Sequence, residues 1–281
     1  MGRSGRAVQP TAEPAPPPLT DELLILLPPS EGKAPGGTGA PVDIAGLSWP
    51  QLAATRQRVL TALVGACRRN PARARAMLGL SEALDADRAA NAEADCSPTM
   101  PAGHRYTGVL HDALGYPTLT VAARQRADGS VVVFSGLWGA TRPVDLLPAY
   151  RIGITTKLPR IGTLPPLWRQ PLLAALDHEI AERGAVDLRS SGYTQMYKPS
   201  EDAAQQLVTV TVTGPDGRKA APSYQSKVAK GRLVRATLEA GVVSVESLIQ
   251  SATTIGLTAD VTPNGIVARA PTGWGLIATR R

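Results

Sequence analysis

The sequence predicts a mixed α/β fold, in which a mixed sheet is flanked by helices, for a chain of 281 residues. Short apolar runs indicate buried strands at 23–27, 131–134 and 185–188. Amphipathic stretches with helical spacing lie between these runs, and strands that alternate with helices are typical of α/β domains. Neither an internal repeat nor a clear linker follows residue 21, so we expect a single domain over 21–281.

The composition excludes several classes of protein. A hydrophobic content of 43% and a charged content of 19% are those of a folded globular chain. The longest apolar runs are far shorter than the roughly 20 residues of a membrane span, so no membrane partner is expected. Two cysteines exclude a disulfide framework and favour a reducing, cytoplasmic location. The net charge of +7 indicates anionic partners such as nucleic acid or nucleotides.

The elements of the N-terminal half follow from apolar spacing and from helix-breaking residues. Residues 1–20 hold five prolines and no apolar period, so we expect a disordered tail. The strand at 23–27 is stopped by two prolines. Helical spacing then predicts a helix over 51–66 and a second one over 71–94, interrupted near Gly79, with Ser81 as the cap of its second part.

The C-terminal half continues the alternation. We expect a buried strand at 131–134, a helix at 170–183, a short strand at 185–188 and an alternating, half-buried strand at 205–213. The next helix, 225–240, ends at a glycine, and Ser244 caps another helix that runs to about residue 252. Two short strands, 266–270 and 275–278, complete the fold.

The first candidate site lies directly after the first strand, where open α/β sheets place ligand-binding loops. Residues 28–33 resemble a phosphate loop, with Ser30 and Lys33 as the candidate ligand-binding residues. A Walker A loop would require glycine in place of Leu27 and serine or threonine in place of Ala34. A surface turn with a solvated lysine is the structural alternative.

A second candidate segment spans 104–111. Arg105 and Tyr106 could stack on a base or bind a phosphate. His104 and His111 are seven positions apart, which is not a metal-ligand spacing on a helix. We therefore expect no metal site, and the sequence indicates no cofactor.

Two further segments follow predicted strands. Trp138, between two glycines in 135–139, either approaches a ligand or anchors the core. Arg189 and Ser190 lie at the end of the third strand and could form an anion-binding loop. Neither segment contains the glycine pattern of a nucleophile elbow, so a serine hydrolase is poorly supported.

The most basic segment lies near the C-terminus, between Gly214 and Arg235. Its candidate nucleic-acid-binding residues are Lys227, Lys230, Gly231, Arg232 and Arg235. Two helices joined by a glycine turn are compatible with a helix-hairpin-helix, a motif that binds the nucleic-acid backbone. A solvated helix face is the alternative explanation of the charge pattern.

Together these segments resemble the YaaA family of peroxide-stress proteins. The resemblance covers the chain from residue 23 onward and is carried by LLILLPPSEGK (23–33), YTGVL (106–110), SGLWGATRPVDLLPAYRIG (135–153), VDLRSSGY (186–193) and SKVAKGRLVR (226–235). It implies a mixed α/β fold with a basic cleft and a helix-hairpin-helix-like element. It also implies a cytosolic DNA-binding protein that limits peroxide damage by keeping free intracellular iron low.

Two functions are therefore carried forward. The first is binding to the DNA backbone with low sequence preference. The second is an enzyme that acts on a nucleotide, nucleoside or nucleic acid, with a nucleotide-like small molecule as its ligand. For the enzyme we expect Lys33, Arg105, Arg189 and Lys230 to share one basic pocket, with Trp138 or Tyr106 stacking on a base. In that case Arg189→Ala should abolish activity and leave the fold intact.

Overall fold

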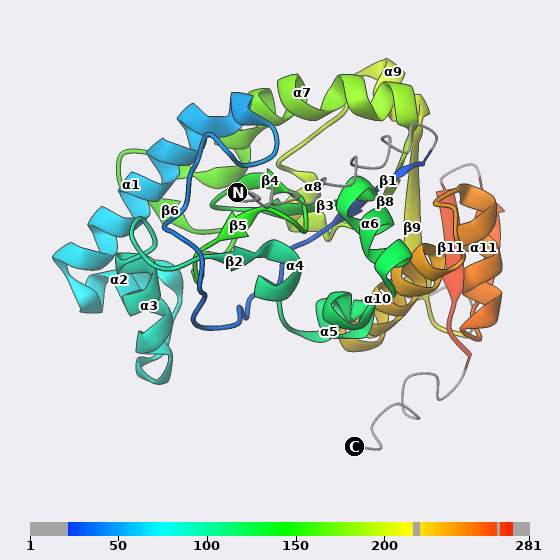
Figure 1. The fold of residues 1–281 in the computed structure, drawn as a ribbon, viewed down its shortest axis with the longest axis horizontal. Helices are drawn as coiled ribbons and strands as arrows, with labels where there is room; N and C mark the ends of the chain where they lie inside the picture. Colours follow the sequence, from blue (N-terminus) through cyan, green and yellow to red (C-terminus); the bar gives the residue numbers. More distant parts are fainter. Residues whose placement is uncertain (1–21, 216–219, 263–264, 272–281) are drawn as a thin grey trace, which may run out of the picture.

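A seven-stranded mixed sheet organises the computed structural model, which describes residues 22–215, 220–262 and 265–271 (Figure 1). In spatial order the strands are β10 (Thr258–Thr262), β11 (Gly265–Arg269), β9 (Leu207–Thr213), β8 (Ala185–Asp187), β1 (Leu24–Leu27), β3 (Val131–Ser135) and β4 (Gly139–Thr141). All pairs from β11 to β3 are parallel, whereas β10 and β4 pair antiparallel at the two edges. The mixed α/β prediction is confirmed.

Helices surround this sheet. They are α1 (Ala53–Arg69), α2 (Pro71–Leu78), α3 (Asp85–Ala92), α4 (Ala102–Arg105), α5 (Val109–Leu114), α6 (Val121–Ser130), α7 (Leu164–Arg183), α8 (Ser191–Thr194), α9 (Glu201–Gln205), α10 (Ser223–Glu239) and α11 (Val245–Thr254). In Figure 1, α7 crosses the top of the molecule, whereas α5 and α10 pack side by side below the strands. No helix of the described residues is long and apolar enough to cross a membrane.

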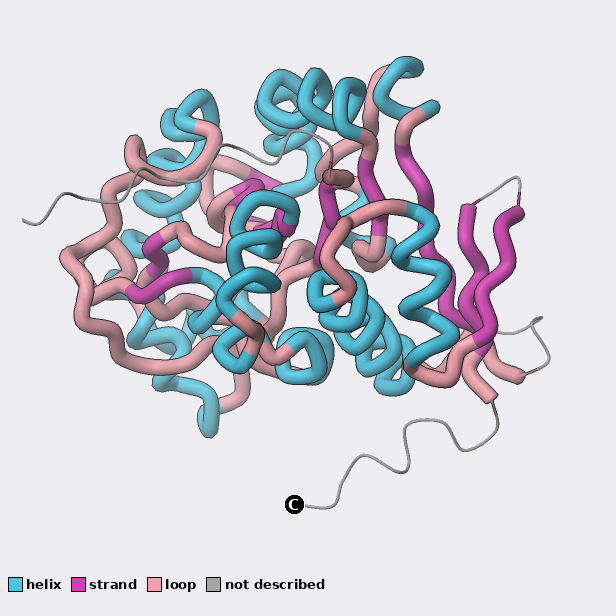
Figure 2. Tube along the Cα trace, turned by 45° about the vertical axis from the view of Figure 1, so that its right-hand side comes forward, coloured by secondary structure: helices cyan, strands magenta, loops and turns pink. Residues whose placement is uncertain are grey.

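The smaller elements lie beside α1, α2 and α3. β2 (Met100–Pro101) pairs with β5 (Leu146–Leu147), and β6 (Lys157–Leu158) pairs with β7 (Gly162–Thr163). In Figure 2 the short strands lie toward the left, and the strands of the large sheet extend from the middle of the molecule to its right-hand side. One apolar core joins these parts and includes the completely buried strand β1.

Most predicted elements are confirmed, with local corrections. Ser244 caps α11 in a capping box with Ser247, as the sequence indicates. Ser81 forms no side-chain capping bond, because a 3-10 turn at Glu82–Leu84 comes between it and α3. The sequence analysis did not predict the edge strands β4 and β10, the short strands β2, β5, β6 and β7, or the helices α4, α5, α6, α8 and α9. The expected tail at 1–20 and the expected strand at 275–278 lie outside the described residues.

The close contact between α10 and α5 depends on Gly231. A Cβ atom at this position would lie 2.2 Å from the Leu110 carbonyl oxygen and 2.7 Å from the Ala113 Cβ. Gly231 therefore serves the packing of two helices, and its buried backbone is not exposed for nucleic acid. This corrects its assignment as a nucleic-acid-binding residue.

We expect Gly231→Ala to lower the free energy of unfolding by about 1–3 kcal/mol, because the added methyl group forces α10 away from α5. Urea denaturation followed by circular dichroism measures this loss. Gly65→Ala is the control, since a Cβ on Gly65 of α1 meets only the flexible end of Arg69 at 3.5 Å. Equal stability of Gly231→Ala and the wild type would contradict the close packing.

Candidate functional site

A cleft of about 800 Å³ lies at the carboxyl ends of β1 and β8. Parallel strands end at the same edge of a sheet, which is why the loops after β1 and β8 meet here. Further walls come from the loop after α2, the start of α5 and the segment after Tyr150. The first turns of α10 complete the cleft. The lining segments are 28–32, 78–80, 107–111, 151–155, 188–193 and 221–230, each contributing several residues.

One wall of the cleft is a polar stripe on α10. Its side chains recur at helical spacing: Ser223, Ser226, Lys227 and Lys230. Lys227 is exposed, whereas Lys230 is half-buried and its Nζ donates to the Leu188 carbonyl oxygen at 2.9 Å. Burial lowers the pKa of Lys230. This stripe brings Lys227 and Lys230 to the loop that follows β8.

The loop after β1 forms the opposite part of the lining. Ser30, Glu31 and Gly32 line the cleft, and the Ser30 hydroxyl donates to the Gly32 carbonyl oxygen at 2.5 Å. The Glu31 carboxylate forms an ion pair with Arg151 at 3.1 Å, and Arg151 also pairs with Asp87 of α3 at 3.1 Å. These ion pairs join the loop after β1 to α3 through Arg151.

Lys33 is folded back onto the same loop. Its Nζ donates to the carbonyl oxygens of Ser30 at 2.7 Å and Glu31 at 3.3 Å. The ammonium lies 4.3 Å from the centre of the Tyr150 ring. Burial, followed by the charge of Arg151, lowers the pKa of Lys33 to about 7. Lys33 does not belong to the cleft lining, so the expectation that it shares the pocket with Lys230 is corrected: only its two hydrogen-bond acceptors, Ser30 and Glu31, line the cleft.

Arg105 was expected in the cleft but lies outside its lining. Its side chain is completely buried and donates to the carbonyl oxygens of Ala34, Gly36 and Leu147, the last two at 2.7 Å and 3.0 Å. All of these acceptors are backbone groups, so the guanidinium holds the loop after Lys33 in place. The role of Arg105 is structural, and it is not available to a phosphate.

Arg105→Lys tests this role, because lysine keeps the charge but cannot donate to several carbonyl groups at once. Loss of hydrogen bonds from a charged group costs about 1.5–3 kcal/mol. We expect amide exchange of residues 34–39 to accelerate by about tenfold or more, whereas β1 keeps its exchange rates. Unchanged exchange at 34–39 would show that other contacts hold the loop.

Tyr106 and Trp138 are also core residues. Trp138 is 0% exposed, and its ring packs edge-on against Tyr150. The Tyr106 hydroxyl bonds to that of Tyr150 at 2.9 Å, and Tyr150 bonds in turn to the Ser135 hydroxyl at 2.8 Å. The expectation that either ring stacks on a base is therefore corrected: no exposed face is left. The chain turns directly from β3 into β4, so the 135–139 loop does not reach the cleft.

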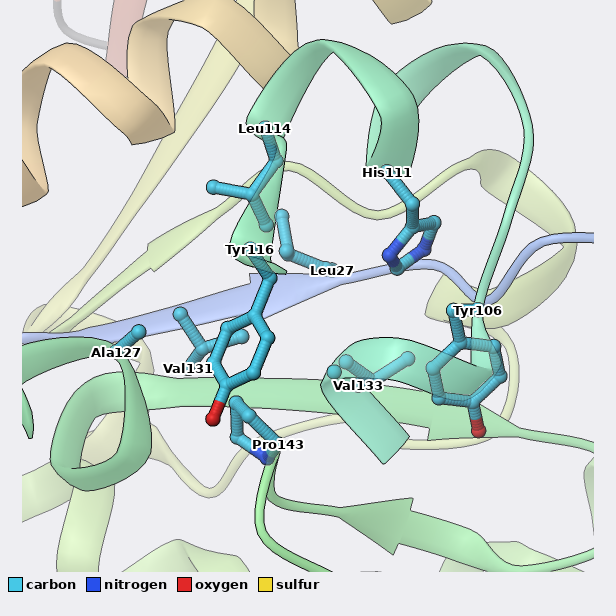
Figure 3. Close-up of a pocket in the computed structure, with 10 residues that line it drawn as sticks. Leu27, Tyr106, His111, Leu114, Tyr116, Ala127, Val131, Val133 and Pro143 are labelled. Atoms are coloured by element: carbon cyan, nitrogen blue, oxygen red, sulfur yellow. The ribbon is translucent and has the colours of Figure 1, made fainter. Parts of the chain in front are cut away.

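His111 lines the cleft and stacks on Tyr106, with ring centres 5.2 Å apart (Figure 3). Its Nε2 lies 3.1 Å from the Pro28 carbonyl oxygen. A carbonyl only accepts, so Nε2 carries the hydrogen. Burial lowers the pKa of His111 to about 4, which keeps the ring neutral. The space between these rings and Tyr116, also drawn in Figure 3, measures about 10 Å³ and is too small for an organic ligand.

Arg189 is buried in an ion pair with Asp187. Its Nε and Nη2 donate to the two carboxylate oxygens at 2.9 Å and 2.7 Å, and the guanidinium lies 4.3 Å from the Phe134 ring centre. Removing the arginine would leave a buried, unpaired carboxylate. The expectation that Arg189→Ala spares the fold is therefore corrected. Its neighbour Ser190 is exposed and lines the cleft.

The remaining basic residues of α10 lie beyond the cleft lining. Arg235 donates to the carbonyl oxygens of Leu114 and Thr118 and pairs with Glu239 at 2.8 Å. It thus ties α10 to the end of α5, which corrects its assignment to nucleic-acid binding. Arg232 is half-buried and lies outside the lining. The basic residues of α10 are thus divided: Lys227 and Lys230 line the cleft, whereas Arg235 supports the fold.

Several lining residues were not selected from the sequence, above all Arg151, Tyr193, Ser223 and Ser226. Three of them lie inside the segments that carry the family resemblance, and helical spacing from Lys227 and Lys230 would have found the two serines. No group of three or more His, Cys, Asp or Glu side chains in the described part of the chain is arranged to hold a metal ion.

Comparison with known proteins assigns the chain to a family. A family model described as "Peroxide stress protein YaaA" matches residues 23–260. The chain is 44% identical over 219 residues to UPF0246 protein SCO2297 of Streptomyces coelicolor, covering 78% of this chain and 84% of the relative. It is 40% identical over 246 residues to UPF0246 protein CE1889 of Corynebacterium efficiens, covering 85% and 91%. This chain belongs to the YaaA family of peroxide stress proteins.

Proposed function

We propose that this protein binds the phosphate backbone of DNA in its cleft, as a cytoplasmic component of the peroxide stress response. The observation that carries the proposal is the stripe of Ser223, Ser226, Lys227 and Lys230 that lines one wall. Lysine and serine side chains are common phosphate ligands in protein–DNA complexes. The first turn of α10 adds backbone N–H groups and the positive end of a helix dipole.

The chemistry of this wall favours recognition of phosphates over recognition of base sequence. Lysine acts as a point charge, and serine hydroxyls bind phosphate oxygens in any sequence context. Arg151 lines the cleft, but its planar fork, which could read guanine, forms ion pairs with Glu31 and Asp87. Arg105 and Arg189 are likewise bound to groups within the fold. We therefore expect low sequence preference.

Affinity measurements with labelled duplexes test the proposal. We expect the logarithm of the association constant to fall linearly with the logarithm of salt concentration, and duplexes of unrelated sequence to bind within about threefold of one another. Affinity that is independent of salt, or strong preference for one sequence, would contradict backbone binding.

The helix pair α10 and α11, joined through Gly241, remains a proposed helix-hairpin-helix-like element within this function. Reduced free iron in stressed cells, which family membership suggests, is also part of the proposal. Electron paramagnetic resonance of chelatable iron in cells with and without the protein measures it. Equal iron signals under peroxide would contradict that part alone.

The size of the cleft supports a second proposal, an enzyme that binds a nucleotide. The cleft volume of about 800 Å³ falls within the usual range of small-molecule sites, about 300–1,000 Å³. Lys227 and Lys230 would then bind the phosphates of one ligand. Calorimetric titration with a panel of nucleotides tests this function, and absence of heat with every nucleotide at millimolar concentration would exclude it.

A further inference from the structure

Lys33 is a primary amine placed beside the cleft without a carboxylate partner. Its two hydrogen bonds go to the carbonyl oxygens of Ser30 and Glu31, both residues of the cleft lining. Among the described residues no carboxylate forms an ion pair with it; the nearby Glu31 carboxylate pairs with Arg151 instead. A lysine that served only as a phosphate ligand would gain nothing from being desolvated in this way.

The surroundings of Lys33 favour a neutral, nucleophilic amine. The titratable and charged groups around it are Glu31 of its own loop, Tyr150 and Arg151, Asp87 of α3, Tyr106 and His111. Burial and the adjacent Arg151 together lower its pKa to about 7. Lysines desolvated in this manner are the ones that form Schiff bases with carbonyl compounds.

Intact DNA offers no electrophile to such an amine, because the carbonyl groups of its bases belong to amide-like rings. A nucleotide that has lost its base differs, since its deoxyribose opens to expose a C1′ aldehyde. The phosphates on either side of that sugar are still available to the lysines of α10. An abasic nucleotide therefore combines two chemistries: its phosphates suit the lysines that line the cleft, and its aldehyde suits the Lys33 amine, which is bonded to the cleft-lining residues Ser30 and Glu31.

We propose that Lys33 is the nucleophile of an abasic-site lyase: it forms a Schiff base with the C1′ aldehyde of an abasic nucleotide whose flanking phosphates are bound by Lys227 and Lys230. The inference rests on the proposed DNA binding. It assigns to Lys33 a covalent role that phosphate binding alone does not require.

The reaction balances without a further reactant. The Nζ lone pair attacks the C1′ carbon, the carbonyl oxygen leaves as water with both amine hydrogens, and a protonated imine forms after uptake of one proton. The imine acidifies C2′, whose proton passes to water while a C2′–C3′ double bond forms. The C3′–O bond breaks and the 3′ phosphate leaves with its electron pair. Hydrolysis of the imine then returns the free amine of Lys33.

Borohydride trapping tests the proposal, because reduction of the imine fixes the protein to DNA. The full chain is mixed with an oligonucleotide that carries one abasic site, reduced, digested and mapped by mass spectrometry. We expect a single principal adduct, on Lys33, and a trapping rate that rises with pH to a plateau with a midpoint near the pKa of about 7. An adduct spread over the exposed lysines, or none, would overturn the proposal.

Two comparisons separate this inference from the proposed DNA binding. A tetrahydrofuran oligonucleotide, which has no aldehyde, reports binding alone; if it binds while the abasic oligonucleotide gives no adduct on Lys33, only the lyase inference fails. If it does not bind, both proposals fail. We expect Lys33→Arg to reduce trapping at least tenfold, and Lys198→Arg, at an exposed lysine outside the cleft lining, to leave it unchanged. Equal trapping by both variants would overturn the role of Lys33.

Discussion

Reversal of charge at Lys227 and Lys230, each to glutamate, is expected to weaken binding to every DNA duplex by roughly 100-fold at low salt. Both side chains lie on the cleft wall of α10, where the proposed phosphate contacts form. Each replacement removes a phosphate contact and adds repulsion, and the loss should be uniform across sequences because the contacts carry no base information. Fluorescence anisotropy with several labelled duplexes measures the change.

The matched control is reversal of Lys157 and Lys198, two exposed lysines outside the cleft lining. The control changes the net charge of the protein by the same amount, so it separates cleft contacts from general electrostatic attraction. We expect it to lose less than about threefold in affinity. Equal losses in the two double variants would show that the cleft is not the binding surface.

Asp187→Ala is expected to produce the largest loss of stability among single substitutions near the site. The carboxylate of Asp187 is the ion-pair partner of Arg189, whose side chain is only 2% exposed. Removing one member of a buried ion pair leaves the other charge unpaired and costs about 3–5 kcal/mol. Chemical denaturation followed by circular dichroism measures the free energy of unfolding.

Ser190→Ala serves as the control for this substitution, since Ser190 is exposed and adjoins the same strand end. Substitutions at exposed sites of this kind change the free energy of unfolding by about 0.5 kcal/mol or less. A loss of less than about 1 kcal/mol for Asp187→Ala would mean that water reaches Arg189 and replaces the carboxylate.

Local sequence patterns were sufficient for the main strands and helices but not for every boundary. Apolar runs predicted β1 and β3, because strands buried in a parallel sheet are apolar on both faces, whereas alternation of apolar and polar residues predicted the half-buried β9. α7 begins at Leu164, earlier than expected, because Pro165 and Pro166 lie in the first helical turn, where proline is tolerated, and the helix continues through Pro171. β10 escaped prediction because this edge strand is only partly buried and mostly polar.

The candidate site was predicted in its position but not in the roles of its residues. The loops after β1 and β8 meet as parallel strands require. The residues with a role other than the predicted one include arginines, whose hydrogen-bond partners cannot be read from the sequence, and the core rings of Tyr106 and Trp138. Arg105 donates to carbonyl groups 42 and 69 residues away, and these contacts exist only after the chain has folded. Arginine in a glycine-rich or serine-rich segment therefore does not by itself indicate a ligand.

Amide hydrogen exchange with and without a short DNA duplex tests the central claim, that DNA binds in the cleft, most directly. The cleft lining includes the loop 28–32 and the segment 221–230, which come from opposite ends of the sequence. We predict slower exchange in both segments when DNA is bound, and unchanged exchange in α7 at the top of Figure 1. Protection elsewhere on the surface, with these two segments unaffected, would contradict the account.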